Sequence, residues 1–100
     1  GNLFAGGKNV VKKTFSVDGV CDRCKKRIED AAYIKGVKFA DWDKHSRSLT
    51  VDFDSTKTNT DMIMQSIAKV GHDTQLFKAS PEDYNKLPSC CRYKSGLKTH

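Results

Sequence analysis

The chain has 100 residues, 37% of them hydrophobic, and a formal net charge of +6. This length allows one domain with a modest core, and no apolar run is long enough to span a bilayer, so we expect no insertion into the membrane. The positive charge is compatible with an acidic partner or an anionic surface.

The first part of the chain predicts a lead-in, a strand and a helix. Residues 1–9 are rich in glycine and show little apolar periodicity, so we expect a flexible lead-in. Residues 10–17 alternate between apolar and polar side chains, as a half-buried strand does. Residues 22–34 carry apolar side chains at a spacing of three to four, as an amphipathic helix does, and Gly36 supplies a stop.

The middle of the chain predicts a hairpin and a second helix. Residues 37–43 and 48–53 alternate as two strands, and the polar turn between them favours pairing as a hairpin. Thr60 or Asp61 can cap a helix that runs to residue 70 and has an apolar side. This helix ends at Gly71.

A short last strand, residues 74–78, completes the pattern, with Leu76 as its best buried candidate. The order β-α-β-β-α-β predicts an α+β, ferredoxin-like sandwich, in which two helices pack on one face of a four-stranded antiparallel sheet. We therefore expect this domain over residues 10–79, followed by a C-terminal extension over residues 80–100.

Cys21 and Cys24 lie three residues apart, where the strand pattern gives way to the helix pattern. At that place Cys24 falls in or near the first helical turn, where unpaired N–H groups and the helix dipole favour a thiolate. Two easily ionised thiols on an exposed loop suit a soft metal ion such as Cu(I), or equally a redox-active disulfide. A buried structural pair is a third interpretation.

Several short motifs follow one another in a fixed order along residues 10–79. They are Cys21-x-x-Cys24, Ile28 with Glu29, Gly36-Val37, Thr50-Val51-x-Phe53-Asp54 and Gly71-His72-Asp73. Through these motifs the chain resembles the heavy-metal-associated domain of copper chaperones, copper-transporting ATPases and mercuric-ion-binding proteins. The resemblance implies the same ferredoxin-like sandwich, with two cysteines that bind the ion and pass it to a partner by ligand exchange.

Three further residues are candidate metal ligands. We expect His72 in a loop at the same end of the sheet as the first cysteine pair, where its imidazole can bind the ion or hydrogen-bond to a thiolate, with a solvated loop histidine as the alternative. Cys90 and Cys91 lie in the extension, and residues 79–89 are long enough to bring them back to the first pair. Since adjacent side chains in an extended segment point in opposite directions, we expect only one of them to complete a three-sulfur site easily. An oxidisable tail, or a disulfide with the first pair, is the alternative.

The sequence therefore predicts a small metal-binding module that is not an enzyme. We expect it to hold Cu(I), with Hg(II) and Zn(II) as alternatives, and either to sequester the ion or to pass it to a metal-transporting membrane protein or another acceptor. Thiol–disulfide exchange through the CxxC is the alternative function. The chain lacks the aromatic-Cys-Gly-Pro-Cys surround of thioredoxin-like proteins, which argues against that alternative.

Lys25, Lys26 and Arg27 predict a patch that binds an acidic docking face on the acceptor, with an ordinary solvated helix face as the alternative. The expected sheet lacks the paired aromatics of an RNA-recognition motif, so we expect no nucleic-acid partner. We expect a monomer, with a metal-bridged dimer as the alternative. Leu87-Pro88-x-Cys90-Cys91 resembles an extension of some bacterial, membrane-facing family members, which favours a periplasmic or other extracytoplasmic location over a cytoplasmic one.

Overall fold

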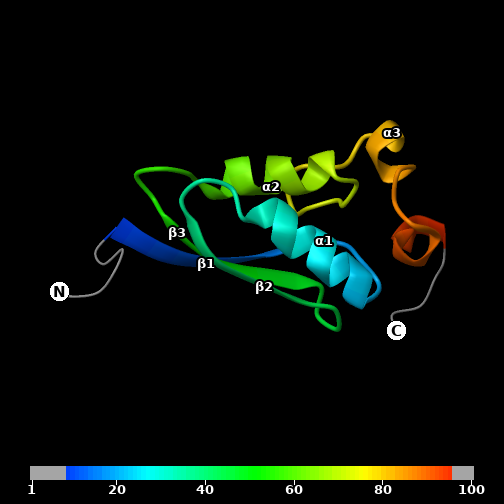
Figure 1. The fold of residues 1–100 in the computed structure, drawn as a ribbon, viewed down its shortest axis with the longest axis horizontal. Helices are drawn as coiled ribbons and strands as arrows, with labels where there is room; N and C mark the ends of the chain where they lie inside the picture. Colours follow the sequence, from blue (N-terminus) through cyan, green and yellow to red (C-terminus); the bar gives the residue numbers. More distant parts are fainter. Residues whose placement is uncertain (1–8, 96–100) are drawn as a thin grey trace.

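A computed structural model of the chain describes residues 9–95, so the predicted lead-in, apart from Asn9, and the last five residues lie outside the described part. Figure 1 shows two layers, with α1 and α2 on one side of a sheet and the end of the chain beside them. The elements are β1 (Val10–Ser16), α1 (Asp22–Ala32), β2 (Val37–Asp43), β3 (Ser48–Asp54), α2 (Thr60–Lys69), α3 (Pro81–Tyr84) and the short 3-10 helices η2 (Ser89–Cys91) and η3 (Tyr93–Ser95).

The sheet within residues 9–95 is antiparallel and has the strand order β1-β3-β2. Because successive side chains of a strand point to opposite faces, alternate residues of each strand reach the helices. Leu49 of β3 lies opposite both Phe15 of β1 and Trp42 of β2, and all three side chains are buried. The predicted hairpin of β2 and β3 is confirmed.

The two main helices close this core. Cys24, Ile28 and Ala32 form the buried side of α1, at the predicted helical spacing. On α2, Asn59 is the N-cap, and its side chain accepts a hydrogen bond from the Met62 amide at 2.8 Å, so the predicted cap at Thr60 or Asp61 is wrong by one residue. No helix within residues 9–95 is long and apolar enough to cross a membrane.

The predicted fourth strand is absent from the described residues. Only an isolated β-bridge joins Thr74 to Val17, and the chain then turns. Two hydrogen bonds close this turn: the Thr74 hydroxyl accepts one from the Phe77 amide at 2.9 Å, and the Thr74 amide donates one to the Phe77 carbonyl at 2.8 Å. Leu76, predicted to be buried, is 64% exposed. A side chain that bonds to the local backbone competes with sheet pairing, and here the local turn forms instead.

After this turn, residues 80–95, which we call the extension, fold back over the end of the molecule where α1 begins and α2 ends (Figure 1). Ser80 caps α3 by accepting from the Asp83 amide at 3.1 Å, with Pro81 at the first helical position. Leu87 and Cys91 are buried in the main hydrophobic core. Lys94 also contacts the domain, since its ammonium lies 3.3 Å from an Asp73 carboxylate oxygen.

Candidate metal site

The first cysteine pair lies at the start of α1, as predicted. Cys21 is the N-cap residue, with extended backbone angles, and Cys24 lies in the first helical turn. Cys24 is fully buried and Cys21 is 8% exposed, so the expected exposed loop is wrong. The pair lies instead at the edge of the core, because Cys24 belongs to the apolar side of α1.

The loop that leads into this pair is held from two sides. The Trp42 indole Nε1 donates to the Val17 carbonyl at 2.9 Å, and Gly19 is so close to the indole ring that a Cβ there would lie 3.0 Å from it. On the other side, the Asp18 amide donates to the Asp73 carbonyl at 2.9 Å. The backbone before Cys21 is therefore positioned by its own neighbours, without a metal ion.

The extension brings a third sulfur to the pair. The Cys21 Sγ lies 3.7 Å from the Cys24 Sγ and 3.8 Å from the Cys91 Sγ, and all three sulfurs lie within 4.8 Å of one another. All four cysteines of the chain are free thiols. Within residues 9–95 this is the group of side chains whose atoms are placed to share a metal ion.

The two cysteines of the extension differ in position, as predicted. Cys91 is fully buried, whereas Cys90 is half-buried and its sulfur is not in the cluster. Cys90 contributes its backbone instead. The Cys21 thiol donates a hydrogen bond to the Cys90 carbonyl oxygen, with the Sγ 3.5 Å from that oxygen. The two side chains diverge on a 3-10 turn rather than on the extended segment that we expected.

The sulfur spacing lets one ion contact more than two sulfurs. At a metal–sulfur distance of about 2.3 Å, sulfurs lie about 3.8 Å apart around a tetrahedral ion and about 4.0 Å apart around an ion with three ligands in one plane, whereas two sulfurs on opposite sides lie about 4.6 Å apart. The distances of 3.7 and 3.8 Å from Cys21 match the first two arrangements and are too short for the third. Thiolate groups prefer soft ions, so the cluster has the composition and the spacing of a soft-metal site.

The three thiols differ in acidity. Burial raises the pKa of Cys21, but hydrogen bonds from the Cys24 amide and thiol and from the Arg23 amide outweigh it, and the net pKa lies below the ordinary value of 9.0. Burial raises the pKa of Cys24 above that value, and burial together with the Cys24 sulfur raises the pKa of Cys91. The prediction that the helix start favours a thiolate at Cys24 is therefore wrong, because the effect falls on Cys21, the N-cap residue.

His72 is fully buried and is not part of the sulfur cluster. Its Nδ1 lies 2.8 Å from the Asp18 carbonyl oxygen, which can only accept, so we assign the ring proton to Nδ1. Its Nε2 is buried and has no hydrogen-bond partner among the described residues. Burial lowers the pKa of His72 to about 4. The neutral ring thus supports the loop before Cys21, and a role as a metal ligand stays a prediction.

Tyr93 is a residue of the site region to which the sequence pattern assigned no role. Tyr93 lies two positions after Cys91 in the chain. Its hydroxyl forms hydrogen bonds with the backbone of Gly71 and Asp73. The available signal was a large aromatic residue directly after the second cysteine pair, in a segment otherwise rich in polar residues. Such a residue marks a segment that is packed against the domain rather than free.

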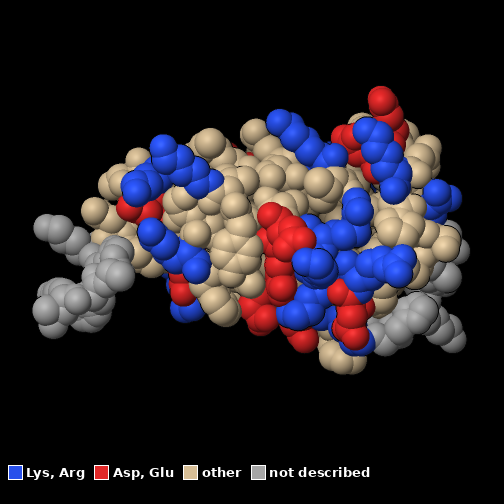
Figure 2. Space-filling model, in the orientation of Figure 1, with Lys and Arg blue, Asp and Glu red and all other residues tan. Residues whose placement is uncertain are grey.

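The predicted basic patch on α1 is largely neutralised within the chain. The Lys25 ammonium lies 2.7 Å from a Glu29 carboxylate and 2.9 Å from an Asp41 carboxylate, and Lys26 also pairs with an acidic residue. The Arg27 guanidinium donates to a backbone carbonyl at 2.7 Å. Figure 2 shows acidic and basic side chains mixed over α1. These residues therefore match the solvated-face interpretation better than a docking patch.

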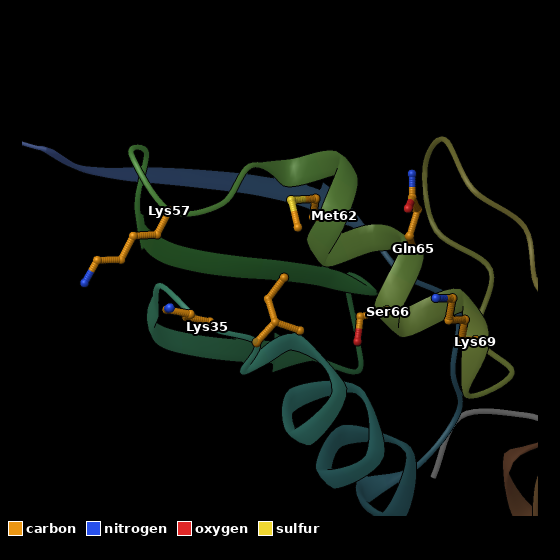
Figure 3. Close-up of a pocket in the computed structure, with 7 residues that line it drawn as sticks. Lys35, Lys57, Met62, Gln65, Ser66 and Lys69 are labelled. Atoms are coloured by element: carbon orange, nitrogen blue, oxygen red, sulfur yellow. The ribbon is translucent and has the colours of Figure 1, made fainter.

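A more strongly basic surface lies at the opposite end of α1 from the cysteines. It surrounds a groove of about 430 Å³ that is lined by Ile34, Lys35, Lys57, Met62, Gln65, Ser66 and Lys69. Figure 3 shows that these side chains come from α2, from the segment after α1 and from the connection before α2. Its three lysines form no ion pair with any residue of the described range.

No protein-family model and no curated protein sequence matches the chain. Solved structures do match. The structure titled CopZ metallochaperone has 27% identity and a TM-score of 0.61, over 64% of this chain and 98% of that one. A putative copper-ion-binding protein from Bacillus anthracis has 25% identity and a TM-score of 0.62, over 66% and 96%.

Oxidized MerP from Ralstonia metallidurans, at 22% identity and a TM-score of 0.56 over 65% of this chain and 96% of that one, is similar in fold. These matches span nearly the whole of the other proteins and leave the rest of this chain unmatched. They confirm the resemblance stated above. The chain thus has the fold of the CopZ metallochaperone and of the copper-ion-binding protein, with its own CxxC pair at the start of α1, and it adds an extension that carries Cys90 and Cys91.

Proposed function

We propose that this protein binds one Cu(I) ion between Cys21 and Cys24, with Cys91 as the third ligand, and carries or sequesters the ion rather than catalysing a reaction. The observation that supports this most directly is that the three sulfurs lie within 4.8 Å of one another. Hg(II) shares the preference for sulfur and is the alternative ion. Zn(II) fits less well, since structural zinc sites have four protein ligands and this cluster offers three sulfurs.

Release of the ion follows from ligand exchange. A thiolate of the acceptor binds the ion, the bond between the ion and one cysteine sulfur breaks, and the released sulfur takes up a proton. Cys91 is the ligand best placed to leave first, because it lies on the extension and its release leaves α1 undisturbed. The ion is then shared between the first pair and the acceptor.

The acceptor that we propose is a metal-transporting membrane protein, or another thiolate-bearing protein, with an acidic docking face. The net charge of +6 supports an acidic partner. Electrostatic attraction of this kind mainly raises the rate of encounter, so transfer to the acceptor should slow as the ionic strength rises.

Competition with a chromophoric Cu(I) chelator, under argon and with reductant, tests the proposal. If a binding free energy of about 10–16 kcal/mol is shared among three or four ligands, each lost sulfur weakens binding about 100-fold or more. We therefore expect Cys91→Ser to lose about that factor and the double variant Cys21→Ser/Cys24→Ser to lose high-affinity binding altogether. The matched control is Cys90→Ser, whose sulfur lies outside the cluster.

Unchanged affinity in the double variant would contradict the metal site. Equal affinities of Cys91→Ser and Cys90→Ser would remove Cys91 from it. If the reduced wild-type chain bound no Cu(I) and exchanged disulfides with a thiol substrate, the alternative function through the CxxC would be correct instead. Circular dichroism of each variant shows whether the fold persists, and we expect it to, because the core forms from the sheet and helices without metal.

A further inference from the structure

Cys91 is the one sulfur of the cluster that does not belong to the strand–helix turn. It lies on a 3-10 turn of only three residues, Ser89–Cys91. A turn this short does not fix its own position relative to the rest of the molecule. The contacts on either side of it must therefore determine whether the Cys91 sulfur reaches Cys21 and Cys24.

On the C-terminal side, Tyr93 attaches the extension to the loop after α2. Its hydroxyl donates to the Gly71 carbonyl at 2.9 Å and accepts from the Asp73 amide at 2.8 Å. Its ring stacks on His72, with the ring centres 5.9 Å apart and the planes inclined by 19°. One side chain thus contacts three consecutive residues of the domain.

On the N-terminal side, Leu87 is buried and reaches the same loop. A Cβ at Gly71 would lie 3.0 Å from the Leu87 side chain and 2.8 Å from the Asp83 carbonyl oxygen. The extension therefore approaches the loop as closely as a glycine allows. Leu87 is anchored by apolar packing, whereas the contact at Tyr93 depends on two directed hydrogen bonds.

We propose that Tyr93 is the positioning residue that holds the Cys91 sulfur against Cys21 and Cys24. Only Arg92 separates Tyr93 from Cys91, so fixing the tyrosine keeps the Cys91 backbone within about 7 Å of it. The inference rests on the proposed function for its role in metal binding, but the positioning itself concerns the metal-free protein. Among the described residues, the printed hydrogen bonds of the Tyr93 hydroxyl go to Gly71 and Asp73 and not to a sulfur, so we propose that it acts through the placement of Cys91.

The variant Tyr93→Phe removes both hydrogen bonds and keeps the ring that stacks on His72. The matched control is Tyr84→Phe, which loses a hydrogen bond from the Lys94 amide at 2.9 Å. That bond joins two residues of the extension and does not attach it to the domain. Both variants make the same chemical change, and only the first one releases the attachment to the loop.

The first measurement is the alkylation rate of Cys91 in the reduced, metal-free protein, read by peptide mass spectrometry after iodoacetamide treatment. Cys91 is fully buried, so we expect slow reaction in the wild type and in Tyr84→Phe. Loss of two hydrogen bonds of ordinary strength shifts the equilibrium between the attached and the detached extension about 5- to 150-fold toward the detached form. We therefore expect the alkylation rate of Cys91 in Tyr93→Phe to rise by a factor in that range. An unchanged rate overturns the proposal.

The second measurement is the number of sulfur ligands in the Cu(I) complex, from X-ray absorption spectroscopy. We expect three in the wild type and in Tyr84→Phe, and a value between two and three in Tyr93→Phe. A general structural role would lower the thermal unfolding temperature without changing this number. Two sulfurs in the wild type, together with fast Cys91 alkylation in Tyr93→Phe alone, would contradict the proposed function and leave the positioning role of Tyr93 supported.

Discussion

At the scale of single residues, the three thiols of the cluster differ in acidity because they differ in backbone position. Cys21, as the N-cap, faces amides at the start of α1, and these lower its pKa. Cys24 and Cys91 lie in the core, where burial raises the pKa of each. Cys21 is therefore the first of the three thiols to lose its proton as the pH rises, and a bound ion must displace the protons that the cluster still holds.

His72 gives a prediction on stability. Its pKa is about 4 in the folded protein, against 6.5 for an ordinary histidine, so between these values the unfolded chain takes up a proton that the folded chain does not. The contribution of the neutral His72 ring to the free energy of unfolding is fully present above pH 6.5 and falls by about 3 kcal/mol as the pH drops to 4. We expect the free energy of unfolding, from urea titrations at a series of pH values, to decrease less steeply in His72→Asn.

The control for this measurement is His45→Asn, because His45 is exposed. An asparagine at position 72 can still donate to the Asp18 carbonyl. If the wild type and His72→Asn lost stability in parallel between pH 6.5 and 4, the buried neutral ring would not be the cause. The same variant tests the metal role, since a loss of Cu(I) affinity as large as that of Cys91→Ser would make His72 a ligand.

The position of the first cysteine pair, Cys21 and Cys24, at the start of a helix could be predicted from spacing alone. The reason is that the residues before the pair show the period of a strand and the residues after it show the period of a helix. That one of Cys90 and Cys91 lies in the cluster agrees with the prediction, although the segment is a 3-10 turn and not the extended chain on which the prediction rested. The role of Tyr93 could not be predicted, because its contacts to Gly71 and Asp73 are long-range and leave no periodic pattern. The burial of His72 likewise depends on the ring of Tyr93 above it.

At the scale of the elements, the extension is a second layer of the site rather than a tail. Leu87 is its main apolar anchor, buried against Gly71 and included in the central core. Truncation of a core leucine to alanine costs about 2–5 kcal/mol. Since Leu87 joins the extension to the domain, we expect Leu87→Ala to loosen residues 80–95 and to leave β3 intact.

Hydrogen exchange followed by mass spectrometry measures this effect. Peptides from the extension should exchange faster in Leu87→Ala, while peptides from β3 keep their wild-type rates. Leu76→Ala is the matched control, because the same atoms are removed from a side chain that is 64% exposed. Equal exchange in the two variants would show that Leu87 does not anchor the extension.

The bounds of the main elements could be predicted to within a few residues, since β1, α1, β2, β3 and α2 each bury one side and show it in their periodicity. The segment after α2 could not. Thr74 and Phe77 have the β-branched and aromatic character of a strand, but the Thr74 hydroxyl closes a local turn with the Phe77 backbone. Residue type indicates strand preference, whereas this hydrogen bond decides between a strand and a turn.

At the scale of the whole molecule, the extension makes the three-sulfur cluster complete within one chain. A soft ion held by only two thiolates has room for a third, and a second copy of the protein can supply it. Cys91 occupies that position and is fully buried, so the wild type needs no second copy. This favours the monomer over the metal-bridged dimer that the sequence left as the alternative.

We therefore expect the wild type to remain a monomer when loaded with Cu(I) under reducing conditions, and Cys91→Ser to form Cu(I)-dependent dimers whose fraction rises with protein concentration. Sedimentation velocity with and without Cu(I) measures this, and Cys90→Ser, which keeps all three clustered sulfurs, should behave like the wild type. A chelator should return the Cys91→Ser dimers to monomers, because the ion is their bridge. If wild type and Cys91→Ser dimerised equally, the third sulfur would have to come from outside the chain in both, and Cys91 would not close the site.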